Sequence, residues 1–269
     1  MGNKKEENKN IENKSTNSKL SEAANYLAGR KSVFEVNEKL LHNNRFFTDD
    51  SFLLILKEIL DKCEKTIEPD TILFRSRIYN EADKEERKNG ITVGQQFEGY
   101  DAKESFVNEH KDWPSYGRMN PNGIRVLYTS SDLKTSMKEL NPAYGELLSV
   151  AKIQCKKSLK IADMSLVITD DNDMLKKGII ETIQEQLSQG YSEKEYIFSQ
   201  YVAAYCQKLG FDGIGFRSKY STKSDHDKNN GINYTIFNYK KCEVISSELH
   251  IIKNVTLQED SISINKKQK

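Results

Sequence analysis

Three short segments of this 269-residue chain place an arginine, a glutamate or a serine beside an apolar run or a turn. Arg75 follows an apolar pair, Arg118 precedes a turn, Glu139 follows a polar helix start, and Ser218 ends an apolar run. The planar fork of arginine gives bidentate, charge-assisted bonds to phosphate that lysine cannot copy. A carboxylate can stabilise a developing positive charge electrostatically. These segments therefore hold candidate groups for an anionic substrate and a cationic transition state.

The segment Tyr116–Glu139 positions two of these groups and reads YGRMNPNGIRVLYTSSDLKTSMKE. A turn signal at 120–123 leads into the apolar run Ile124–Tyr128 and then into a polar helix start. Turn-rich segments that feed a strand and then a helix are common in folded domains. The pattern predicts Arg118 before the turn and Glu139 on the helix after the strand.

The register of the arginines near residue 75 is open to two readings, because Arg75 and Arg77 are two positions apart. The period of two in a strand places both side chains on the same face, so either could enter a site. We favour Arg75, which directly follows the apolar pair Leu73-Phe74.

From Thr71 onward, short apolar runs are typical of strands, and two longer segments, 173–189 and 196–209, have helical spacing. This alternation predicts an α+β fold, with a small, mostly antiparallel sheet and flanking helices. The expected strands are Thr71–Arg77, Ile124–Thr129, Leu147–Cys155, Leu159–Ala162, Gly213–Phe216, Asn233–Asn238 and Val244–Ile252.

The ends of the chain differ in composition from its centre. Residues 1–18 and 258–269 are mostly polar or charged, which predicts disordered tails because such segments bury little apolar area. Residues 19–69 carry apolar side chains at helical spacing and predict a helical N-terminal extension. The main domain is expected over 70–257.

Composition excludes several classes of function. A net charge of +1 gives no electrostatic case for direct nucleic-acid binding. The four cysteines are scattered without metal-ligand spacing, so no metal site is expected. No apolar run is long enough to span a membrane, and the first residues lack a secretory signal, which predicts a cytoplasmic protein without membrane contact.

The order of these blocks resembles the RES domain family, which is named for its Arg, Glu and Ser and whose members consume NAD. The most specific block is G-R-M-N-P-x-G-I-x-x-L-Y-T-x-x-x-x-x-T-x-x-x-E at Gly117–Glu139. It is followed by Gln200-Tyr-Val-Ala, by G-F-D-G-I-G-F-R-S at Gly210–Ser218, and by G-I-N-Y-T-I-F at Gly231–Phe237. The resemblance implies a sheet core similar to that of ADP-ribosyltransferase toxins.

The resemblance also implies roles for individual residues. Glu139 is the carboxylate that bonds the ribose hydroxyls and stabilises an oxocarbenium-like centre. Arg75 and Arg118 are cations for the pyrophosphate or the ribose side. Tyr128 is a wall of the substrate site with its hydroxyl free to bond a ribose or phosphate oxygen, and Ser218 bonds the nicotinamide amide or positions Glu139.

Asn120 and Gln200 are weaker candidates for substrate binding, because the first is also a turn residue and the second also a polar residue on a helix. The glycines of Gly210–Phe216 do not form the G-x-G-x-x-G fingerprint of a Rossmann dinucleotide site.

The implied activity is cleavage of the nicotinamide–ribose bond of NAD, with transfer of ADP-ribose to water or phosphate and with no cofactor. The implied setting is a growth-inhibiting toxin paired with a DNA-binding antitoxin, although compact toxins of the family lack a segment like 1–69. Two alternatives remain at this stage. One is an ADP-ribosyltransferase that modifies a protein, and the other is a non-catalytic module that binds NAD or a partner.

Overall fold

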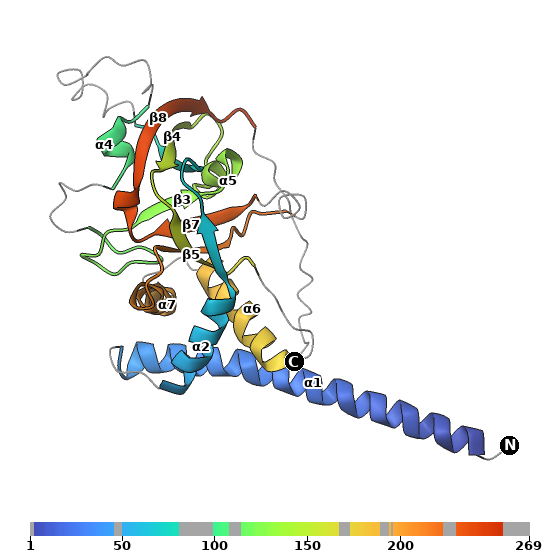
Figure 1. Ribbon diagram of the computed structural model, residues 1–269. Coiled ribbons are helices and arrows are strands. Elements are labelled where there is room, and N and C mark those ends of the chain that lie inside the picture. Colours follow the sequence, from blue (N-terminus) through green and yellow to red (C-terminus); the bar gives the residue numbers. More distant parts are fainter. Residues whose placement is uncertain are drawn as a thin grey trace, which may run out of the picture.

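The computed structural model describes residues 3–45, 50–80, 99–107, 114–166, 173–188, 194, 196–222 and 230–254. These residues form one eight-stranded sheet in the order β1-β5-β6-β7-β3-β2-β4-β8 (Figure 1). Only the β5–β6 pair is parallel among the pairs described, and the other six are antiparallel. The expected α+β class with a mostly antiparallel sheet is therefore confirmed.

The strands follow the predicted apolar runs closely. Their bounds are β1 (Glu64–Ile67), β2 (Ile72–Ile78), β3 (Leu127–Ser130), β4 (Leu147–Cys155), β5 (Leu159–Asp163), β6 (Gly213–Arg217), β7 (Ile232–Ile236) and β8 (Cys242–Ile251). The helices are α1 (Asn3–His42), α2 (Asp50–Lys62), α4 (Ala102–Ser105), α5 (Leu133–Lys138), α6 (Met174–Ser188), α7 (Tyr196–Lys208) and the 3-10 turn η1 (Tyr239–Lys241).

The N-terminal part differs from expectation at two points. The expected helical extension ends in a strand, because β1 (Glu64–Ile67) pairs antiparallel with β5 and adds an edge to the sheet. Helix α1 begins at Asn3, inside the segment 1–18 for which composition predicts disorder. A helix forms its backbone hydrogen bonds within itself, so a polar segment can continue one without burying side chains. The expected tail 258–269 lies outside the described residues, and the domain boundaries stay a prediction.

The helices α1, α2, α6 and α7 lie together on one side of the sheet (Figure 1). They bury an apolar core between themselves and that face, which includes Leu56, Ile183, Phe198, Ile214 and Phe216. A second core on the opposite face is built from strand residues such as Leu73, Leu127 and Ile153. None of the helices in the described ranges is long and apolar enough to cross a membrane.

Helix α1 packs tightly on α6 and is part of the main core. A Cβ atom at Gly178 would collide with the backbone carbonyl oxygen of Tyr26, so the two helix backbones approach as closely as glycine permits. The Tyr26 hydroxyl donates to Glu181 Oε2 at 2.6 Å. Arg30 forms a two-point ion pair with Glu185, at 3.0 and 2.7 Å. The N-terminal extension therefore helps to hold the helix whose last carbonyl groups accept hydrogen bonds from Arg118.

Replacing Gly178 with alanine tests this close approach. Where the space beside a helical glycine can hold a methyl group, Gly→Ala stabilises a protein by about 0.5–1 kcal/mol. At Gly178 the sign should reverse, with a loss of about 1–3 kcal/mol, because the added methyl group forces α1 away from α6. Urea unfolding measures this change, and Ser21→Ala on the exposed side of α1 is the control. A Gly178→Ala variant more stable than the parent would contradict the packing.

Candidate active site

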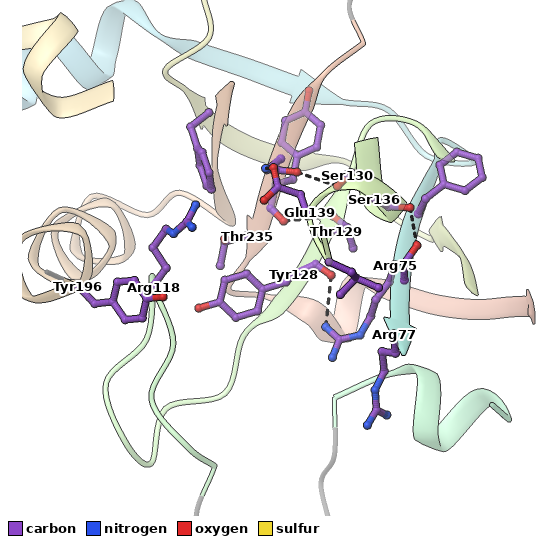
Figure 2. Close-up of a pocket in the computed structure, with 16 residues that line it drawn as sticks. Arg75, Arg77, Arg118, Tyr128, Thr129, Ser130, Ser136, Glu139, Tyr196 and Thr235 are labelled. Carbon is purple, nitrogen blue, oxygen red and sulfur yellow. Dashed lines mark hydrogen bonds between the residues drawn. The ribbon is translucent and has the colours of Figure 1, made fainter. Parts of the chain in front are cut away.

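A cavity of about 410 Å³ opens where β2 and β3 diverge (Figure 2). These strands are in register only at Phe74 opposite Ser130, and the Arg75 side chain extends from β2 to the backbone of β3 beside that pair. The volume is within the ~300–1,000 Å³ typical of small-molecule sites. The lining residues are Phe74, Arg75, Ser76, Arg77, Arg118, Tyr128, Thr129, Ser130, Ser136, Glu139, Leu140, Tyr196, Phe216, Asn233, Tyr234 and Thr235.

Glu139 lies at the C-terminal end of the short helix α5, where it is the C-cap residue. Asp132 caps the other end by accepting a hydrogen bond from Thr135 N at 2.8 Å. The Asp132 carboxylate also accepts from Thr135 Oγ1 at 2.7 Å and from Gly231 N at 2.9 Å. Burial opposes the charge, but these hydrogen bonds prevail and lower the pKa of Asp132. Asp132 thus ties α5, and with it Glu139, to the start of β7.

Two neutral donors fix the Glu139 carboxylate. Ser218 Oγ donates to Glu139 Oε1 at 2.5 Å, and Asn233 Nδ2 donates to the same oxygen at 2.6 Å. Ser218 is buried, 4% exposed, and is not among the lining residues, so it meets the cavity through Glu139. Of the two roles expected for Ser218, the structure shows the contact with Glu139.

Arg75 reaches from β2 toward β3 and donates from Nη1 to the backbone oxygen of Tyr128 at 3.3 Å (Figure 2). Its Nε is buried and has no hydrogen-bond partner within the described part of the chain. Burial and the nearby charge of Arg77 lower the pKa of Arg75 to about 10. A buried donor without an acceptor is costly, and an anionic group is a strong acceptor for a guanidinium.

Arg77 lies at the rim of the same cavity but is held differently. It is exposed, and its Nη1 donates to the backbone oxygen of Glu104 at 2.5 Å. Its guanidinium also stacks over the Tyr100 ring, 4.7 Å from the ring centroid. The two arginines therefore differ in their contacts. Arg77 contacts the α4 segment, whereas Arg75 contacts β3, which favours Arg75 as the inner cation.

Arg118 lies on the loop before β3 and connects the cavity to α6. Its Nη1 donates to the backbone oxygens of Leu187 and Ser188, at 3.2 Å each. These carbonyls end α6, where the helix dipole is negative, so the positive side chain is stabilised there. Its own backbone oxygen accepts from Ser199 Oγ of α7 at 2.6 Å. Arg118 is therefore a lining residue with an anchored side chain.

The Tyr128 hydroxyl is engaged, which corrects the expectation that it is free to bond substrate. It donates to Asn120 Oδ1 at 2.7 Å and accepts from Met119 N at 2.9 Å. Burial raises the pKa of Tyr128 to about 12. A Cβ atom at Gly117 would lie only 2.6 Å from this hydroxyl, which explains the glycine there. Tyr128 thus offers its ring to the cavity, while its hydroxyl fastens the Arg118 loop.

Asn120 and Gln200 lie outside the lining of the cavity. Asn120 Nδ2 donates to the backbone oxygens of Ser115, Pro121 and Ile124, at 2.9 to 3.2 Å. Gln200 Nε2 donates to the backbone oxygens of Gly117 and Asn120, at 2.8 and 3.1 Å. Both amides therefore hold the loop that carries Arg118.

Several lining residues had no role in the sequence analysis. Asn233 and Thr235 alternate with Ile232, Tyr234 and Ile236 in β7, and that period of two was the signal that a polar face was present. Tyr196 comes from the first turn of α7, and no feature of the sequence distinguishes it from a core tyrosine.

Among the described residues, no group of three or more His, Cys, Asp or Glu side chains could hold a metal ion. The four cysteines are free and buried. The positively charged side chains that line the cavity are those of Arg75, Arg77 and Arg118.

Comparison with known proteins gives a family and one distant structural likeness. The model of the RES domain matches residues 96–257, a range that contains Arg118, Glu139 and Ser218 but begins after Arg75. No curated protein matches the chain significantly. Among solved structures, the M. tuberculosis MbcT–MbcA toxin–antitoxin complex is similar at 12% identity with a TM-score of 0.39, covering 73% of this chain and 92% of that chain.

The family match covers more than half of the chain and includes the cavity-lining residues other than those of β2, which precede the matched range. The order of Arg118, Glu139 and Ser218 expected from the resemblance falls inside the matched range. This protein therefore belongs to the RES domain family.

Proposed function

We propose that this protein is an enzyme that degrades NAD by cleaving the bond between nicotinamide and ribose. Its family acts on NAD, and the cavity has the residue types that this reaction needs. The observation that carries the proposal is the placement of one fixed carboxylate, Glu139, in the same cavity as Arg75 and Arg118.

The reaction breaks the bond from ribose C1′ to the nicotinamide nitrogen, and the bonding electron pair leaves with the nicotinamide. Positive charge then spreads over C1′ and the ring oxygen, as in glycoside hydrolysis. Glu139, fixed by Ser218 and Asn233, needs no reorientation when this charge develops. A preorganised charge of this kind stabilises the transition state more than the ground state.

The arginines are proposed to bind the pyrophosphate. Arg75 has a buried donor without a partner among the described residues, and Arg118 lines the cavity from the loop before β3. The rings of Phe74, Tyr128 and Tyr196 provide flat apolar surfaces that suit nicotinamide or adenine. The proposed catalytic group is Glu139, and Asn120, Gln200 and Ser218 act by positioning other residues.

The acceptor of ADP-ribose is proposed to be water or phosphate, with loss of a proton from the acceptor as it bonds C1′. Depletion of cellular NAD would stop growth, so the proposal includes a toxin role. A DNA-binding antitoxin is its proposed partner, as the family resemblance implies.

The direct test is incubation of purified protein with NAD, with and without phosphate, followed by product identification. We expect release of nicotinamide together with ADP-ribose or its 1″-phosphate, unchanged by a metal chelator, because arginines supply the positive charge. ADP-ribose attached to an added protein would instead favour the transferase alternative. Intact NAD at micromolar enzyme would favour a binding module.

Glu139→Gln removes the charge of the carboxylate and keeps its shape. We expect turnover to fall by roughly 10²-fold or more, because a preorganised charge at this position acts mainly on the transition state. The Kd for NAD should change far less. Steady-state kinetics and direct binding measure the two effects, with Glu243→Gln at an exposed position of β8 as the control. Turnover near the parent value, with the fold intact, would remove Glu139 from the mechanism.

Arg75→Met separates binding from stability. Turnover and NAD affinity should both fall, because the pyrophosphate is held in the ground state and in the transition state. Without ligand, the variant should be more stable by on the order of 1 kcal/mol after allowing for solvent screening, because burial disfavours the charged form of Arg75. The folded-state pKa lies below the unfolded value, so this gain is present at neutral pH and fades as pH rises through about 10.

The control for that variant is Arg77→Met, at the exposed rim of the cavity. It should leave the free energy of unfolding unchanged or lower, because it loses the contacts with Glu104 and Tyr100. Its effect on NAD turnover should be milder than that of Arg75→Met. If Arg77→Met lost more activity, the assignment of the two arginines would have to be exchanged.

A further inference from the structure

We propose that Asn233 is the positioning residue of Glu139, and that its amide, oriented by Ser130, selects which carboxylate oxygen is presented to the substrate. This inference rests on the proposed function for its kinetic readout. It adds to that function a polar relay between β3 and β7 that is distinct from the Arg, Glu and Ser for which the family is named.

The relay is built on the register of two neighbouring strands. Ser130 of β3 and Asn233 of β7 are directly paired, so their side chains leave the sheet side by side. Ser130 Oγ donates to Asn233 Oδ1 at 2.7 Å, and Asn233 Nδ2 donates to Glu139 Oε1 at 2.6 Å. Both Ser130 and Asn233 are buried, at 4% and 8% exposure.

The orientation of the amide follows from chemistry. If the amide were reversed, its oxygen would face a carboxylate oxygen at 2.6 Å, with no proton between two acceptors. Ser130 reinforces the observed orientation, because its hydroxyl donates to the amide oxygen. A serine on the neighbouring strand thus ensures that the amide presents its NH₂ group to Glu139.

The two donors act on the same atom. In the part of the chain that the structure describes, the hydrogen bonds from Ser218 and Asn233 to the Glu139 side chain both end on Oε1. Oε2 is therefore the oxygen that the geometry assigns to the ribose. An amide and a hydroxyl fix the carboxylate and leave its negative charge in place. A cation at that position would neutralise it.

Charged groups face this relay from several elements. Arg75, Arg77 and Arg118 line the same cavity. On α5, Lys138 donates to the backbone oxygen of Tyr220 at 3.2 Å, and Asp132 caps the other end of the helix. These charged groups are unchanged in every variant below. Differences in kcat or Tm between the variants therefore come from the substitution in the relay.

The test is Asn233→Asp, which replaces the NH₂ donor with a carboxyl group of the same shape. Two carboxylates this close cannot both ionise, so the pair retains one proton well above the usual carboxyl range. While protonated, the new aspartate donates to Glu139 as the amide does. Once that proton is lost, two negative charges repel each other and Glu139 is displaced.

We therefore expect a new pH dependence of kcat. Asn233→Asp should retain most activity at about pH 5 and lose roughly 10-fold or more as pH rises to about 8, with a midpoint at least about 2 units above the usual carboxyl value of ~4. The parent should show no such loss in that window. Asn233→Ala should lower kcat roughly 10- to 100-fold at all pH values, with a smaller change in KM.

Asn238→Asp is the matched control. Asn238 lies just past the same strand, is exposed, and donates from Nδ2 to the carboxylate of Asp212 at 3.0 Å. The same substitution there also brings two carboxylates together, but away from the cavity. The kcat of Asn238→Asp divided by the kcat of the parent should be the same at every pH. A constant ratio for Asn233→Asp as well would overturn the proposal.

A second readout needs no activity and separates this inference from the proposed function. The shared proton raises a carboxyl pKa in the folded state, so the Tm of Asn233→Asp relative to the parent should fall as pH rises from 5 to 8. If the parent leaves NAD intact but this Tm trend is present, the proposed function fails and the relay stands. A flat Tm difference would show that Asn233 does not face an ionised carboxylate.

Discussion

The carboxylate of Glu139 is the group on which the arrangement of the cavity depends. A charge at the edge of a partly buried cavity needs fixed partners, or it turns toward solvent. Here the partners are a hydroxyl from the end of β6 and an amide from β7, and both donate to Oε1. The helix that carries Glu139 is fixed at its start by Asp132, which also binds the backbone at Gly231. Two segments that are distant from Glu139 in sequence therefore donate to its side chain.

Positively charged side chains, Arg75 and Arg118, also line the cavity. Arg75 fills part of the space between β2 and β3, and its buried Nε has no partner among the described residues. The Arg118 loop is fastened by Tyr128, Asn120 and Gln200, whose polar atoms bond to one another or to its backbone. The buried Nε without a partner costs free energy, and the hydrogen bonds of the loop that carries Arg118 keep that residue at the cavity.

Much of the fold could be predicted because apolar runs of strand length are local signals. The strand β1 was missed because Glu64–Ile67 directly follows a helix with strong periodicity, and its pairing with β5 is a long-range contact. Glu139, Arg75 and Arg118 were proposed from the resemblance of their blocks to the RES family, and the structure brings all three to one cavity. The engagement of the Tyr128 hydroxyl could not be predicted, because its partner Asn120 looked like an ordinary turn residue. Asn233 was recognised only as part of a block, since its role depends on the register between β3 and β7.

The most direct measurement of the central claim is a crystal structure of the Glu139→Gln variant with NAD bound. The account predicts that the ribose next to nicotinamide lies against the side chain at position 139, on the side away from Ser218 and Asn233. It also predicts that the pyrophosphate lies within hydrogen-bond distance of Arg75. NAD bound outside the cavity between β2 and β3, or bound with its pyrophosphate at position 139, would contradict the account.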